Sequence, residues 1–136
     1  MCSILVVEDH KIMAETLVHV LRTKGNFSIA DVAESAEDAL EWLSEQKADL
    51  QVDLALVDVV LPRTSGIELV SMIQQRYPGI PCLMISGHSA GQYVKDSLVA
   101  GARGYVLKDN FQDVLKGIQH VVEGGTYLSE QLSKEE

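Results

Sequence analysis

Apolar and polar residues along this chain follow a repeating order, in which short apolar runs alternate with longer stretches of helical spacing. The five apolar runs lie at residues 3–7, 27–33, 54–58, 82–86 and 104–108. After the first run, Met13, Leu17 and Leu21 recur every four residues, which places them on one face of a helix. Buried strands that alternate with amphipathic helices are typical of a parallel sheet covered by helices. The pattern therefore predicts an α/β domain with five strands and five helices.

Helix start and stop signals support the same division of the chain. Ser35 is a good N-cap for the second helix, and Pro78 stops the third. Gly124 ends the last helix, beyond which no further apolar run follows. These signals predict one domain over residues 1–125. We expect residues 126–136 to be a polar tail or the start of a linker.

Composition narrows the class of protein. The 136 residues are 46% hydrophobic and 23% charged, as in an ordinary globular domain. The apolar runs are too short to span a membrane and no secretory signal opens the chain, so we expect a cytoplasmic protein. The formal net charge of −9 argues against direct binding of nucleic acid by this chain. Cys2 and Cys82 have no zinc-site spacing, and we expect two free thiols, with Cys82 in the core.

Four of the predicted strands end in polar residues of a kind that carries chemistry. These residues are Glu8, Asp9, Asp58, Ser86 and Lys108. Ligands of open α/β sheets bind at the carboxyl ends of the strands, near the point where the strand order reverses. If the first and third strands are neighbours, the three carboxylates converge, and they repel one another unless a cation joins them. Mg²⁺ prefers oxygen ligands and is commonly held by one or two carboxylates with a phosphate, so the sequence predicts a magnesium site.

Asp58 is the candidate nucleophile, because it leaves a carboxylate at the end of a buried strand, where it can attack phosphorus. Lys108 would pair with the incoming phosphoryl group, and Ser86 would donate a hydrogen bond to it. Each residue also has an ordinary interpretation. Asp58 can cap a turn, Ser86 can be a turn residue, Lys108 can be a solvated lysine, and Glu8 and Asp9 can favour a helix N-terminus.

Four segments, "VVEDH", "LVDVVLPRTSG", "MISGHS" and "GARGYVLKD", resemble the motifs of the receiver domain of two-component response regulators. The resemblance covers about residues 3–125, and the motifs stand in the family's order. It implies the flavodoxin-like doubly wound sheet of order 2-1-3-4-5, in which the first strand lies beside the third. It also implies that Glu8, Asp9, Asp58 and the backbone carbonyl of Val60 bind Mg²⁺.

The resemblance further implies a signalling role. Asp58 would accept a phosphoryl group from the phosphohistidine of a sensor histidine kinase, and Ser86 and Tyr105 would form a switch pair. Once Asp58 is phosphorylated, Ser86 would move inward, and the space that it leaves would admit the ring of Tyr105. The output would be a change of surface, so we expect a switch and not an enzyme.

The segments "GARGYVLKD" and "VLKGIQHVVEGGTYLS" resemble the subfamily whose receiver precedes a helix-turn-helix DNA-binding domain. The sequence contains no such domain, so the resemblance implies either a receiver cut from a longer transcription regulator or a natural single-domain receiver. In the first case, contact with DNA would come through the missing output domain. Phosphorylation-dependent homodimerisation is expected on the same grounds.

Two other classes of protein are weaker candidates. Phosphoaspartate hydrolases also use an aspartate nucleophile, but their motif has a second aspartate where this chain has Val60, so a general acid is missing. A flavin or nucleotide carrier on the same fold would need a phosphate-binding loop after the first strand, and "EDHKIM" has the opposite charge. The four histidines show no metal-ligand spacing: His10, His19, His88 and His120. His10, His19 and His120 are assigned no role in the site. The resemblance implies that His88, two residues past Ser86, and Val60, two residues past Asp58, tune dephosphorylation.

Overall fold

The structure is a computed structural model that describes residues 2–46, 51–87 and 91–129. Its strands are β1 (Ser3–Val7), β2 (Ser28–Ala33), β3 (Leu54–Asp58), β4 (Cys82–Ser86), β5 (Gly104–Leu107) and β6 (Tyr127–Leu128). Its helices are α1 (Lys11–Thr23), α2 (Ala36–Glu45), α3 (Gly66–Arg76), α4 (Gly91–Ala100) and α5 (Phe111–Val122). Within the described ranges, no helix has both the length and the apolar character that crossing a bilayer requires.

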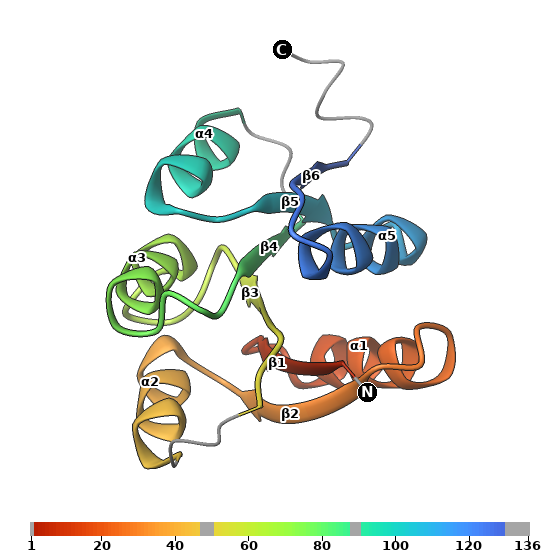
Figure 1. Cartoon of the computed structure of the whole chain (residues 1–136), viewed down its shortest axis with the longest axis horizontal. Coiled ribbons are helices and arrows are strands. Elements are labelled where there is room, and N and C mark those ends of the chain that lie inside the picture. Colours follow the sequence, from red (N-terminus) through yellow and green to blue (C-terminus); the bar gives the residue numbers. More distant parts are fainter. Residues whose placement is uncertain (1, 47–50, 88–90, 130–136) are drawn as a thin grey trace.

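The strands form one parallel sheet of order β2-β1-β3-β4-β5-β6. Helices α1 and α5 cover one face, and α2, α3 and α4 cover the other (Figure 1). The predicted order of the first five strands is confirmed, and β1 does lie beside β3. The predicted N-cap is also confirmed, since the Ser35 hydroxyl accepts a hydrogen bond from the amide of Asp38 at 3.0 Å.

The core lies on both faces of the sheet, as the continuous apolar runs require. Successive residues of a strand point to opposite faces. Leu5 and Val7 therefore join the core beneath α2, α3 and α4, whereas Ile4 and Val6 join the core beneath α1 and α5. Burial on both faces is typical of parallel sheets and explains why these strands lack a polar alternation. Cys82 is fully buried in this core, as predicted.

The start of α3 is packed tightly against the end of β3. Ser65 caps the helix by accepting a hydrogen bond from the amide of Glu68 at 3.1 Å. The amide of Gly66 donates to the carbonyl of Val59 at 2.9 Å. A Cβ atom on Gly66 would overlap the backbone carbonyl of Asp58, so only glycine allows this approach. The backbone of the predicted nucleophile is therefore fixed by the helix that follows it.

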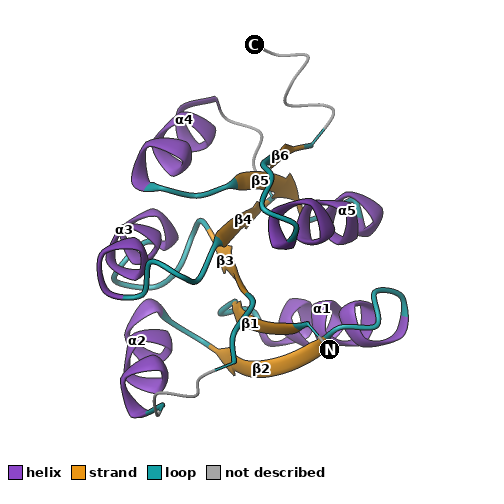
Figure 2. Cartoon of the chain, in the orientation of Figure 1, coloured by secondary structure: helices purple, strands orange, loops and turns teal. Residues whose placement is uncertain are grey.

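The predicted fold class is confirmed, and the sheet has one short strand more than the five predicted, because β6 pairs with β5 at its edge (Figure 2). The amide of Tyr127 donates to the carbonyl of Arg103 at 3.1 Å, and the amide of Ser129 donates to the carbonyl of Tyr105 at 3.1 Å. The buried Ser129 hydroxyl accepts from the amide of Leu107 at 3.2 Å. The described start of the expected C-terminal tail is thus part of the fold.

Candidate functional site

The predicted carboxylates meet at the carboxyl ends of the adjacent strands β1 and β3. The register pairs Val7 with Val57, so Glu8 and Asp58 both follow this last pair. Lys108 follows β5 and reaches across the end of β4 to the same place. We call Glu8, Asp9, Asp58 and Lys108 the acidic site.

Lys108 holds the two buried carboxylates together. Its Nζ atom lies 2.7 Å from Glu8 Oε1 and 2.7 Å from Asp58 Oδ2. The lysine side chain is 15% exposed, and those of Glu8 and Asp58 are 0% and 3% exposed. Burial lowers the pKa of Lys108, but its bonds to Asp58 and Glu8 outweigh this effect, and the net pKa lies above its ordinary value. The ammonium is therefore charged, and it is placed to neutralise negative charge at this point.

The two buried carboxylates differ in acidity because one lysine cannot balance both. Burial and the neighbouring Glu8 raise the pKa of Asp58 to about 6, although Lys108 opposes the shift. Burial also acts to raise the pKa of Glu8, but hydrogen bonds with Asp58, Lys108 and the His10 amide outweigh it and lower the net pKa. Without a further cation the pair thus retains a proton near pH 6, mainly on Asp58.

The acidic site fits a hard divalent cation. Ligand atoms of Glu8, Asp9, His10 and Asp58 all lie within 4.8 Å of one another. Asp9 Oδ1 is buried and, among the described residues, meets His10 Nδ1 at 3.3 Å without forming a hydrogen bond, so a cation bound here would stabilise this carboxylate oxygen. The amide of Val60 donates to Asp58 Oδ1 at 3.1 Å, which orients the carboxylate. Mg²⁺ prefers such a set of oxygen ligands together with water.

Ser86 ends β4, and Tyr105 lies near the start of the neighbouring strand β5, where it pairs with Met84. Both residues are fully buried, and a hydrogen bond joins their hydroxyl groups. Burial raises the pKa of Tyr105, and the bond to Ser86 partly opposes this shift. The ring of Tyr105 is fully buried in this structure, and its role with Ser86 as a switch pair stays a prediction.

His10 was assigned no role from the sequence, yet its ring lies against the acidic site. Its Nδ1 atom is 3.3 Å from Glu8 Oε2 and 3.3 Å from Asp9 Oδ1. The position directly after an acidic pair was the signal in the sequence that could have indicated this contact. Of the other histidines, His19 and His120 do not belong to this cluster, and His88 lies outside the described residues.

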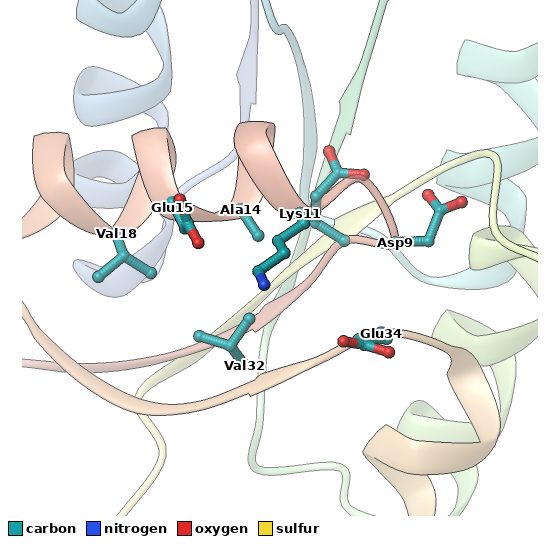
Figure 3. Close-up of a pocket in the computed structure, with 8 residues that line it drawn as sticks. Asp9, Lys11, Ala14, Glu15, Val18, Val32 and Glu34 are labelled. Atoms are coloured by element: carbon teal, nitrogen blue, oxygen red, sulfur yellow. The ribbon is translucent and has the colours of Figure 1, made fainter.

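A cavity of about 390 Å³ opens beside Glu8 and Asp9, between α1 and β2. Ala14, Val18 and Val32 line it, together with the acidic residues Glu15 and Glu34. Figure 3 shows the ammonium of Lys11 over Val32 and turned away from Asp9. Lys11 therefore leaves the Asp9 carboxylate open to another cation.

Comparison with known proteins shows the family to which this chain belongs. The model of the response regulator receiver domain matches residues 4–119. The transcriptional regulatory protein DegU of Brevibacillus brevis is 30% identical over 127 residues, which are 93% of this chain and 52% of DegU. The DNA-binding transcriptional activator DevR/DosR of Mycobacterium tuberculosis is 30% identical over 109 residues, 80% of this chain and 48% of that protein. The chain thus spans about half the length of these curated relatives.

Solved structures show the same fold. A response regulator of the LuxR family from Aurantimonas sp. SI85-9A1 has a TM-score of 0.91 and 24% identity, and covers 99% of this chain and 94% of its own. A CheY-like receiver domain protein from Methanospirillum hungatei JF-1 has a TM-score of 0.78 and 26% identity over 100% of this chain and 99% of its own. The first neighbour matches the described segment after α5 as well as the sheet.

Proposed function

Because the chain belongs to the response regulator receiver family, we propose that it is a phosphoacceptor domain in which Asp58 receives a phosphoryl group from a sensor histidine kinase. The observation that carries this proposal is the position of Asp58. Its carboxylate ends a buried strand and is held between the Lys108 ammonium and the Val60 amide, beside two further carboxylates. A purely structural aspartate has no need of two acidic neighbours.

The chemistry follows from these contacts. An oxygen of Asp58 attacks the phosphorus of the phosphohistidine, a new O–P bond forms, the P–N bond breaks, and the electron pair returns to the leaving imidazole, which takes up a proton. Lys108 keeps its charge and moves from the carboxylate toward the oxygens of the transferred group. A bound Mg²⁺, held by Glu8, Asp9, Asp58 and the carbonyl of Val60, would neutralise charge on the phosphoryl oxygens.

The raised pKa of Asp58 fits this role. A protonated carboxyl is a poor nucleophile, and a pKa of about 6 means that Asp58 keeps its proton below about pH 6 when no further cation is near. A divalent cation favours the ionised form and so prepares Asp58 for attack. The dependence on a cation is therefore built into the crowding of Glu8 and Asp58.

Ser86 and Tyr105 are proposed as the switch pair. The Ser86 hydroxyl can donate a hydrogen bond to the phosphoryl group, and it already contacts Tyr105 on β5. A change at Asp58 therefore reaches β5 and its neighbours α4 and α5 through one hydrogen bond. Ser86→Ala should still take up the phosphoryl group, but amide spectra of the two phosphorylated proteins should differ across residues 91–122. Identical shifts there would refute the coupling.

We propose that the output is control of transcription through a domain outside this sequence, with phosphorylation favouring a homodimer. Support comes from relatives whose names describe transcription regulation and DNA binding, and of which this chain covers about half. With a net charge of −9, this chain alone should not bind DNA. Sedimentation with and without a phosphoryl mimic on Asp58 tests the dimer. An unchanged monomer at high concentration counts against it.

The test of the proposed function is the mass of the intact protein after incubation with phosphoramidate and Mg²⁺. Wild-type protein should gain one phosphoryl group, and Asp58→Asn should gain none. Asp31→Asn, a matched change on β2 outside the acidic site, should behave like wild type. Sustained release of phosphate at enzymatic rates would instead support a phosphoaspartate hydrolase, for which Val60 supplies no acid.

A further inference from the structure

The three consecutive residues Glu8, Asp9 and His10 form a compact loop between β1 and α1, and their side chains converge. His10 occupies the N-cap position of α1, but its side chain makes no capping hydrogen bond. The imidazole is instead directed at the carboxylates, with Nδ1 3.3 Å from Glu8 Oε2 and 3.3 Å from Asp9 Oδ1. The backbone amide of His10 also donates to Glu8 Oε2 at 3.2 Å, which fixes the loop in this shape.

The spacing of these atoms is that of ligands around one metal ion. With metal–ligand distances of about 2.1 Å, neighbouring ligand atoms lie about 3.0 Å apart in an octahedron and about 3.4 Å apart in a tetrahedron. The two distances of 3.3 Å from His10 Nδ1 fall in this range. They are also long for hydrogen bonds to two acceptors at once. Asp58 supplies a fourth ligand atom within 4.8 Å of the others.

Neither Lys11 nor Lys108 occupies the space between His10 and the carboxylates of Glu8 and Asp9, where a metal ion would lie. Lys108 contacts Glu8 through Oε1, whereas His10 faces Oε2 of the same carboxylate. Lys11 extends over Val32, away from Asp9 (Figure 3). Asp9 Oδ1 is buried and lacks a hydrogen bond, although it lies beside the imidazole. A cation between His10 and the two carboxylates would satisfy this oxygen.

We propose that His10 is a nitrogen ligand of the acidic site, which allows the site to bind a borderline divalent ion such as Mn²⁺, Co²⁺, Ni²⁺ or Zn²⁺ more tightly than Mg²⁺. This inference rests on the proposed function, since it uses the same carboxylates. Oxygen ligands alone suit Mg²⁺, whereas imidazole adds affinity for first-row transition metals. The histidine side chain is 69% exposed, so an ion from solvent meets it directly.

The test compares the binding of Ni²⁺ and Mg²⁺ by calorimetry in the wild-type protein, in His10→Ala and in His10→Gln. Wild type should bind Ni²⁺ more tightly than Mg²⁺. Both variants should lose about 10–100-fold in Ni²⁺ affinity, the range seen when metal sites lose a supporting group, with a much smaller change for Mg²⁺. The control His19→Ala removes an exposed histidine of the same helix and should leave both affinities unchanged.

A second readout identifies the ligand atom without reference to affinity. Adding Zn²⁺ should shift the ring signals of His10 in an NMR spectrum of the wild-type protein, and adding Mg²⁺ should shift them far less. Equal Ni²⁺ affinity in wild type and both variants, or His10 ring signals that ignore Zn²⁺, would overturn the inference. Phosphoryl uptake is scored separately on Asp58. A wild type that binds Ni²⁺ through His10 but takes up no phosphoryl group would refute the proposed function and leave this inference standing.

Discussion

The acidic site and the β6 edge, which consists of residues 127–129 paired with β5, lie on either side of β5 and place their buried polar groups in opposite ways. At the acidic site, Glu8 and Asp58 are buried together with one lysine between them, and a carboxylate oxygen of Asp9 has no hydrogen bond. At the β6 edge, the buried Ser129 is bonded through both its amide and its hydroxyl. The polar groups of the acidic site therefore need a ligand to complete their bonding. Those of the β6 edge are fully bonded within the protein.

The β6 edge also divides its side chains between the two halves of the core. Tyr127 packs on the core beneath α1 and α5, and Leu128 packs on the core beneath α2, α3 and α4. The strand covers the edge of β5, whose backbone groups would otherwise be open to pairing with another chain. In this molecule, the buried polar groups that lack hydrogen bonds belong to the proposed functional site, whereas the fully hydrogen-bonded groups at β6 hold the fold together. The following changes test this difference, from the largest expected effect to the smallest.

Replacing Asp9 should have the largest effect, because it removes a ligand from the incomplete region. Asp9→Ala should weaken Mg²⁺ binding by about 100-fold or more, the upper end of what loss of even an outer-shell group costs. Phosphoryl uptake from phosphoramidate should be lost with it. Calorimetry measures the first effect and intact mass the second. If Asp9→Ala binds Mg²⁺ and takes up the phosphoryl group like wild type, the metal site is misassigned.

Replacing Gly104 should disrupt the packing of the β6 edge against β5. A Cβ atom there would overlap the carbonyl of Tyr127 and come within 2.8 Å of Leu83 Cδ1. Gly104→Ala should lower the free energy of unfolding by about 1–3 kcal/mol, as overpacking typically does. Hydrogen exchange at the Ser129 amide should become faster. Gly79→Ala is the control, because no atom lies within 4 Å of its added Cβ. Equal stability of the two variants would show that β6 is not held as described.

Neutralising Asp58 should stabilise the metal-free protein. Its folded-state pKa is raised from 3.8 to about 6, so the folded state binds more protons than the unfolded chain between these values, and stability falls as pH rises through this window. Above this pH window, the full loss of stability caused by the ionised Asp58 is present. Asp58→Asn removes the cost and should add about 1–2 kcal/mol at pH 8 and almost nothing near pH 3.

Denaturant unfolding at both pH values measures this gain. Added Mg²⁺ should stabilise the wild type and not the variant, because the ion replaces the missing positive charge only where Asp58 is ionised. A variant that is less stable than wild type at pH 8 would show that the Asp58 carboxylate is a satisfied structural group.

The smallest effect is expected from Tyr127, whose hydroxyl donates to Asp113 Oδ1 at 2.9 Å. Tyr127→Phe should lower stability by about 0.5–1.5 kcal/mol, the usual net worth of one hydrogen bond. It should leave Mg²⁺ affinity unchanged, because the bond lies at the β6 edge. Tyr77→Phe removes a hydroxyl from outside that edge and serves as the control. A change in Mg²⁺ affinity in Tyr127→Phe alone would mean that the two regions are coupled.

Much of the acidic site could be predicted from the sequence. Asp58 interrupts a buried apolar run, and Glu8, Asp9 and Lys108 follow other such runs, so a parallel sheet brings them to one edge. Periodicity places each residue at a strand end, and the resemblance to the receiver family supplied the sheet order that brings these ends together.

The β6 edge and the contacts of His10 could not be predicted in the same way. A strand of two residues is too short to show alternation, and its partners on β5 lie more than twenty residues away. The burial of Ser129 depends on those hydrogen bonds, which no local pattern encodes. The position of the His10 ring depends on the shape of one loop and on a side-chain rotamer.

The central claim is that Asp58 is the residue that carries the phosphoryl group. The most direct measurement is reduction of the phosphorylated protein with borohydride, which converts an acyl phosphate of aspartate to homoserine, followed by peptide mass mapping. The account predicts homoserine at position 58 in wild-type protein treated with phosphoramidate and Mg²⁺, and none at Asp9 or in protein treated without the phosphodonor. Homoserine at another aspartate, with Asp58 unchanged, would contradict it.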